Sequence, residues 1–172
     1  MASFKNVYES WKKNQIQFWK NQSEDIVWKI KPIKILDDTN APFYKWFPEA
    51  TLNTCYNAID RHVNAGRGEQ VAVIYDSPIT NVKRKISYSQ LQYQVSQFAG
   101  ALLKLDVQKG DRIIIYMPMI PEAIVSMLAC ARIGAVHSVV FGGFASNELA
   151  TRIDDCNPKI IISASCGHEP NK

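Results

Sequence analysis

Residues 116–144 read YMPMIPEAIVSMLACARIGAVHSVVFGGF and carry the pattern that decides the fold. The stretch passes from an apolar strand into a helix that begins at Pro121, because the fixed φ and missing N–H of proline suit the first helical turn. Gly134 is expected to end this helix, since glycine accepts the left-handed backbone found there. An apolar strand then leads to the turn at Gly142 and Gly143. A strand–helix–strand unit that closes on glycines indicates an α/β protein with a ligand crevice at the strand ends.

The same alternation extends on both sides of this stretch. Ser87 and Gln90 form a capping box at the start of an amphipathic helix, and Ser146 is expected to cap a later one. Residues 77–85 are interpreted as a polar turn. Strands are expected over 70–75, 112–116, 135–140 and 159–163, and helices over 87–105, 121–133 and 146–156. Because strands that alternate with helices run in one direction, the sequence predicts the α/β class, with a partial parallel sheet of four strands and flanking helices.

Residues 1–65 differ in character from residues 66–172, and we expect the chain to divide there. All four tryptophans and three prolines lie in this first segment, which has little periodicity (Trp11, Trp19, Trp28, Trp46, Pro32, Pro42 and Pro48). Each large ring buries much apolar area, which favours a strap laid over another surface. A satellite helical subdomain with its own small core is the alternative. The sequence therefore predicts an irregular helical N-terminal extension before the α/β domain.

Composition narrows the functional classes. Of the 172 residues, 47% are hydrophobic and 21% are charged, as in ordinary globular domains, and the apolar run 123–131 is too short to cross a bilayer. The formal charge of +4 is mild, so Lys83-Arg84-Lys85 is interpreted as solvated surface and neither nucleic acid nor membrane is expected as a partner. The cysteine spacing predicts reduced thiols. We expect a cytoplasmic protein, with the mitochondrial matrix as the alternative because the N-terminus is basic.

A ligand is expected at the carboxyl ends of the parallel strands. Gly142 and Gly143 lie at one such end, where backbone amides come close to a ligand because no side chain blocks them. A tight turn that needs positive φ is the alternative. His137 is interpreted as a hydrogen-bonded core histidine, and Arg132 as the partner of helix carbonyls or a carboxylate. The sequence has neither a dinucleotide fingerprint nor a Walker loop, and it assigns no catalytic residue and no metal ligand.

Beyond these patterns, the chain resembles the AMP-forming short-chain acyl-CoA synthetases, the acetyl- and propionyl-CoA synthetase group, over nearly its whole length. Two features are similar to the propionyl branch, namely Leu36-Asp37-Asp38 before an aromatic cluster at 43–46 and the closing GHEPNK loop at 167–172. The sequence motifs that carry the resemblance are Phe18-Trp19, the N-x-x-x-x-A-x-D-R-H run from Asn53 to His62, YMPM at 116–119 and MLACARIGAVHSVVFGGF at 127–144.

The resemblance implies a two-step reaction. A short carboxylate and ATP give an acyl-adenylate and pyrophosphate with the help of Mg²⁺, and the thiol of coenzyme A then displaces AMP. It also implies that the turn at Gly142 and Gly143 approaches coenzyme A. The loop that reaches the phosphate-bearing adenosine end of coenzyme A corresponds to Glu169, Pro170, Asn171 and Lys172.

In this family the ATP phosphate loop, the acyl pocket, the magnesium ligands and the adenylation lysine follow after the region of resemblance. We therefore expect the N-terminal part of a propionyl- or acetyl-CoA synthetase, an acid–thiol ligase, with residues 1–65 as its N-terminal extension and 66–172 as the first part of its AMP-binding domain. Such a part is expected to be inactive alone. Its expected partners are small-molecule substrates and the remainder of the enzyme or a full-length paralogue. The alternative is a natural short paralogue that acts as a non-catalytic binding module.

Overall fold

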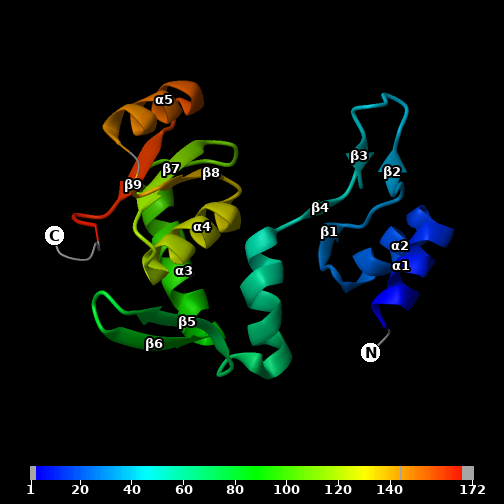
Figure 1. The fold of residues 1–172 in the computed structure, drawn as a ribbon, viewed down its shortest axis with the longest axis horizontal. Coiled ribbons are helices and arrows are strands. Elements are labelled where there is room, and N and C mark those ends of the chain that lie inside the picture. The colour runs from blue at the N-terminus through cyan, green and yellow to red at the C-terminus, as the bar shows by residue number, and fades with distance from the viewer. Residues whose placement is uncertain (1–2, 144, 168–172) are drawn as a thin grey trace. The chain divides into compact units, whose positions relative to one another are not determined.

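The structure, a computed structural model, describes residues 3–143 and 145–167, which form two compact units, residues 1–53 and 54–172 (Figure 1). The first unit opens with helices α1 (Phe4–Lys13) and α2 (Gln15–Gln22) and the short 3₁₀ turn η1 (Ser23–Asp25). Four short strands follow and pair antiparallel, β1 with β4 and β2 with β3. They are β1 (Trp28–Ile30), β2 (Leu36–Asp37), β3 (Lys45–Trp46) and β4 (Thr51–Leu52).

The aromatic rings of the first unit contact one another. The ring of Trp46 lies 5.9 Å from that of Trp19 and 6.2 Å from that of Phe47, and Phe47 lies 5.4 Å from Trp28. Within this unit only Ser23 and Ile35 are buried among the described residues. The rings thus contact one another, but Trp19 and Trp46 remain exposed, and both the strap and the subdomain with its own core stay predictions.

The second unit contains a three-stranded parallel sheet. Its strand order is β8-β7-β9, so that β7 lies in the middle. The sheet is preceded by the π-helical turns η2 (Tyr56–Asp60) and η3 (Val63–Arg67), the strands β5 (Val71–Ser77) and β6 (Val82–Ser87), and helix α3 (Tyr88–Lys104). Strand and helix then alternate through β7 (Arg112–Met117), α4 (Pro121–Ile133), β8 (Val136–Phe141), α5 (Ser146–Cys156) and β9 (Ile160–Ser163).

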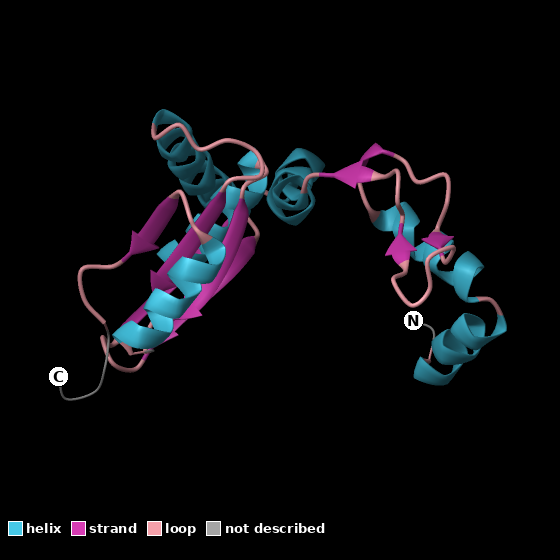
Figure 2. Ribbon diagram, turned by 90° about the horizontal axis from the view of Figure 1, so that it is seen from above, coloured by secondary structure: helices cyan, strands magenta, loops and turns pink. Residues whose placement is uncertain are grey.

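Helices cover both faces of this sheet. Ile113 and Ile115 of β7 are fully buried in a core that they share with α3 and α4. Ile114 points to the opposite face, because side chains alternate along a strand, and it is equally buried. α5 packs against β7. Figure 2 looks from the side on which α5 lies in Figure 1, and it shows a helix in front of the strands and others behind them. The α/β class and the partial parallel sheet are confirmed.

Local signals fixed three helix ends as predicted. The Ser87 side chain accepts a hydrogen bond from the Gln90 N–H, while the Gln90 side chain accepts one from the Ser87 N–H, so the capping box is formed. Pro121 begins α4, and Gly134 ends it with a φ of 78°. The predicted Ser146 cap is wrong, because Ala145 occupies the N-cap position of α5 and gives no side-chain hydrogen bond. Across the described residues, no helix is both long and apolar enough to span a membrane.

The prediction of a four-stranded parallel sheet is wrong for β5. This strand pairs antiparallel with β6, and the two form a separate hairpin (Figure 1). Residues 82–87 are extended, so residues 77–85 are not simply a polar turn. A short turn suffices to join antiparallel strands, and Asn81 closes it with a φ of 53°. Lys83, Arg84 and Lys85 are exposed, as the interpretation as solvated surface requires.

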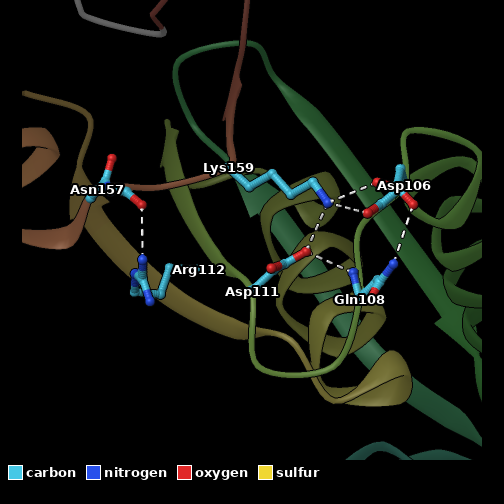
Figure 3. Close-up of polar contacts among 6 residues, drawn as sticks. All are labelled: Asp106, Gln108, Asp111, Arg112, Asn157 and Lys159. Atoms are coloured by element: carbon cyan, nitrogen blue, oxygen red, sulfur yellow. Dashed lines mark hydrogen bonds and ion pairs between the residues drawn. The ribbon is translucent and has the colours of Figure 1, made fainter.

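A polar network holds the amino-terminal ends of β7 and β9 together (Figure 3). The Lys159 ammonium pairs with the Asp111 carboxylate at 3.1 Å and with that of Asp106 at 3.3 Å, and it also donates to the Asp106 carbonyl. The Gln108 backbone N–H donates to Asp111 at 2.8 Å, and Arg112 donates to the Asn157 carbonyl. The Gln108 hydrogen bond and then Lys159 lower the pKa of Asp111, and the hydrogen bond to Asp111 raises the pKa of Lys159.

These shifts predict a pH window for the stability that the network contributes. The lowered pKa of Asp111 gives stability that is lost as the pH falls through it, and the raised pKa of Lys159 gives stability that is lost as the pH rises through it. We expect Lys159→Met to lower the urea midpoint most near neutral pH, and progressively less as the pH falls below about 4 and through the lowered pKa of Asp111. An equal loss at pH 3 and pH 7 would show that the network acts by packing alone.

Candidate functional site

A pocket of about 320 Å³ lies where β7 and β8 end at their carboxyl edge. Three segments enclose it, namely the tip of the β5–β6 hairpin, the loop that follows β7 and the glycine turn that follows β8. Gly167, near the end of the described chain, also lines it. The lining residues are Tyr75, Asp76, Ser77, Pro78, Ile79, Met117, Pro118, Met119, Phe141, Gly142, Gly143 and Gly167. The carboxyl edge of a parallel sheet is where α/β proteins place their ligands.

Gly142 is required by a close approach of two backbone segments. β7 and β8 pair as far as Met117 and Phe141, so the chain leaves the sheet with the two strand ends in contact. A Cβ at Gly142 would lie 2.8 Å from the Met117 carbonyl oxygen and 3.2 Å from the Pro118 nitrogen. The φ of Gly142 is outside the left-handed region, so the alternative of a positive-φ turn does not hold.

A Cβ added at Gly143 would meet a side chain, whereas a Cβ added at Gly142 would meet backbone atoms. A Cβ here would lie 2.6 Å from Cε1 of Phe141, whose ring is largely exposed and lines the pocket. The φ of Gly143 also lies outside the left-handed region. Any larger residue would thus press on the Phe141 ring and fill space at the pocket.

The pocket walls are mostly apolar. The one charged side chain among the described lining residues is Asp76, whose carboxylate pairs with Lys83 at 2.9 Å. Such a lining suits an uncharged ligand group with polar contacts from the backbone, and it does not suit a phosphate. The resemblance assigned four residues to the phosphate-bearing end of coenzyme A, and all of them lie outside the described residues (Glu169, Pro170, Asn171 and Lys172).

Asp60, Gln92 and Arg132 form a cluster in the core of the second unit. Nη2 of Arg132 donates to both carboxylate oxygens of Asp60, at 3.0 and 2.9 Å, and the Gln92 amide donates to Oδ1 of Asp60 at 2.7 Å. The carboxylate partner predicted for Arg132 is therefore confirmed. The cluster ties η2 to α3 and α4 and lies apart from the pocket lining, so we assign it a structural role.

The other titratable groups also act in packing. His137, half-buried in mid-strand, has its pKa lowered by burial, which favours a neutral imidazole, and its predicted hydrogen bond stays a prediction. The ring of His62 lies 4.9 Å from that of Tyr88. Burial raises the pKa of the Cys130 thiol to about 11 and also raises that of Cys55. Across residues 3–143 and 145–167, no three His, Cys, Asp or Glu side chains gather as a metal site.

The hairpin wall of the pocket is the part that sequence reasoning missed. Val82, Arg84 and Ile86 lie on the same face of β6, since side chains alternate along a strand. Because Arg84 is part of the charged Lys-Arg-Lys run, the sequence does not show the alternation of apolar and polar residues that is typical of a strand. Pro78 followed by Asn81 between two extended runs was the available signal for a hairpin.

Two family models match the chain. Residues 4–58 match "Acetyl-coenzyme A synthetase N-terminus", and residues 60–172 match "AMP-binding enzyme". "Acyl-CoA synthetase short-chain family member 3, mitochondrial" of Bos taurus is 54% identical over 91% of this chain and 23% of its own length. "Acetyl-coenzyme A synthetase" of Streptomyces coelicolor is 50% identical over 96% of this chain and 25% of its own length. The chain thus spans about a quarter of the length of these relatives. It belongs to the AMP-binding enzyme family, in the group of the acetyl- and short-chain acyl-CoA synthetases.

Proposed function

We propose that this chain is the N-terminal part of a synthetase that joins a short carboxylate to coenzyme A through an acyl-adenylate. The names of its relatives and the two family models support the reaction class. In this proposal residues 1–65 form the N-terminal extension, and residues 66–172 begin the AMP-binding domain. The remainder of the enzyme is its partner. The cytoplasm is the proposed compartment, with the mitochondrial matrix as the alternative, since the name of the Bos taurus relative includes the word "mitochondrial".

The observation that carries a role for this chain is the pocket at the glycine turn. Its volume of about 320 Å³ is at the low end for a ligand pocket, so it holds only part of a molecule as large as coenzyme A. The apolar walls and the glycine backbone fit an uncharged part of the cofactor. Lys172 follows the pocket residue Gly167 closely in the sequence, and in this proposal Lys172 supplies the cation for a phosphate.

Coenzyme A supplies the thiol that accepts the acyl group. The residues of this chain bind and orient it, since the Gly142 and Gly143 backbone approaches the cofactor while Phe141 and Met119 exclude water from its uncharged part.

Direct binding of coenzyme A tests this proposal. We expect saturable amide shifts at Gly142 and Gly143 in NMR titrations of the 172-residue chain. Gly143→Val should weaken binding about tenfold, because it presses the Phe141 ring into the pocket. Gly100→Val is the matched control, since its added Cβ meets nothing within 4 Å. Absence of saturable binding at millimolar coenzyme A, or equal effects of both substitutions, would contradict the proposal.

A further inference from the structure

The tip of the β5–β6 hairpin forms one side of the pocket. Among the described residues that line the pocket, it supplies Tyr75 to Ile79, so the pocket depends on this hairpin as well as on the sheet. The hairpin lies outside the parallel sheet, and the remaining walls come from the ends of β7 and β8. A ligand held at the Gly142 and Gly143 turn therefore lies between two separate pieces of structure.

The hairpin tip has a defined conformation. Ser77 pairs with Val82 across the two strands, and its largely buried hydroxyl accepts a hydrogen bond from the Thr80 N–H at 3.3 Å. Pro78 fixes its own φ, and Asn81 adopts a φ of 53°. Because its neighbours on both sides are constrained, Ile79 is presented at the pocket on a preformed turn.

A second contact orients the hairpin toward the loop that follows β7. The Arg84 guanidinium lies 5.5 Å from the centroid of the Tyr75 ring and pairs with the Glu122 carboxylate at 3.5 Å. Glu122 lies in the first turn of α4, directly after the loop that contains Met119. Both partners are half-exposed, so the ion pair contributes little stability. The contact shows that the Arg84 side chain of the hairpin lies beside the start of α4, next to the opposite wall of the pocket.

Three large apolar side chains of the lining are exposed, namely Ile79, Met119 and Phe141, at 47%, 85% and 63%. They come from the hairpin, the loop after β7 and the end of β8. By contrast, Val140, beside Phe141, is fully buried in the fold. Exposed apolar side chains that converge on a concave surface are typical of a ligand site.

We propose that Ile79 is a binding residue for coenzyme A, and that its side chain packs on an uncharged part of the cofactor held between the hairpin tip and the glycine turn. This inference rests on the proposed function. None of the sequence motifs that carry the family resemblance includes a residue of this hairpin. The inference therefore adds a binding residue, and it makes the hairpin one of the elements that determine which part of the cofactor binds. A serine in place of Ile79 would keep the turn, because serine is common in turns, but it would lose the apolar contact with the cofactor.

The test compares two isoleucines of the same hairpin. Ile79→Ser is expected to weaken coenzyme A binding by the 172-residue chain about fivefold, because part of an apolar side chain no longer packs on the ligand. Ile74→Ser is the matched control, since Ile74 is 71% exposed on β5 and does not line the pocket. It should change the affinity by less than about twofold. Ile79→Met, which keeps an apolar side chain of similar volume, should restore binding.

Each outcome decides between the two proposals. If the chain binds coenzyme A and Gly143→Val weakens binding while Ile79→Ser does not, the role of Ile79 is wrong and the proposed function stands. If the chain does not bind coenzyme A, both are wrong. Pantetheine and adenosine 3′,5′-bisphosphate represent the two parts of coenzyme A and are titrated separately. The probe for which Ile79→Ser lowers the affinity identifies the part of coenzyme A that contacts Ile79. Equal melting temperatures of the two serine variants would show that the loss is not caused by unfolding.

Discussion

Asp60→Ala is expected to lower the free energy of unfolding of the second unit by about 3 kcal/mol, the largest effect of any single substitution proposed for this chain. The side chains of Asp60 and Arg132 are 13% and 26% exposed, so the substitution would leave a mostly buried guanidinium without this carboxylate. The Gln92 amide would lose its acceptor as well. Removal of one member of a buried ion pair costs far more than the pair itself contributes, because the remaining charge stays desolvated.

Urea unfolding measures this effect, and a second ion pair of the same unit provides the control. Glu122→Ala breaks the half-exposed pair with Arg84 and should cost less than about 1 kcal/mol. The double substitution Asp60→Leu with Arg132→Met should recover part of the loss, because it leaves no buried charge. If Asp60→Ala and Glu122→Ala destabilise the chain equally, the Asp60 cluster is not the structural anchor described above.

Gly142→Ala is expected to destabilise the second unit by about 2 kcal/mol, whereas Gly143→Ala should cost less than about 0.5 kcal/mol. The difference follows from what each added Cβ would meet. At Gly142 it meets the Met117 carbonyl group at 2.8 Å from the oxygen and 3.0 Å from the carbon, and these backbone atoms are held by the pairing of β7 with β8. At Gly143 it meets the outer edge of the Phe141 ring, a side-chain group that is largely exposed.

Thermal melts of the two alanine variants distinguish these roles, and coenzyme A titration of the same samples completes the comparison. Gly142→Ala should lower the melting temperature markedly, while Gly143→Ala should leave it almost unchanged. Similar melting temperatures for the two variants would mean that the strand ends adapt to a Cβ, and that the close approach does not explain the first glycine.

The sequence predicted those parts of the fold in which local and tertiary preferences agree. The β7–α4–β8 unit has a proline at the helix start, a glycine at its end and apolar strands on both sides, so each signal points to the same structure. The capping box at Ser87 acts within four residues and needs no tertiary partner. β7 is buried on both faces, so its run of three isoleucines was unambiguous.

The hairpin could not be predicted with the same ease, because its second strand is mostly exposed. Only Ile86 of β6 is buried in the core, while Lys83, Arg84 and Lys85 face solvent and give the run the character of a loop. Because the hairpin was not predicted, the sequence also did not indicate the side of the pocket that the hairpin forms. The glycine turn was predicted because its residue type is unusual, whereas Ile79 acquires its place only through contacts that the three-dimensional structure creates.

The central position of β7 has a consequence for synthesis on the ribosome. Ile113 of β7 pairs with His137 of β8 and with Ile160 of β9, and the second partner lies about twice as far along the chain. As the nascent chain emerges, β7 and β8 are complete well before β9 exists, so one edge of an isoleucine-rich strand stays open to other chains. Until β9 has emerged, this edge of β7 is therefore exposed to pairing with other chains.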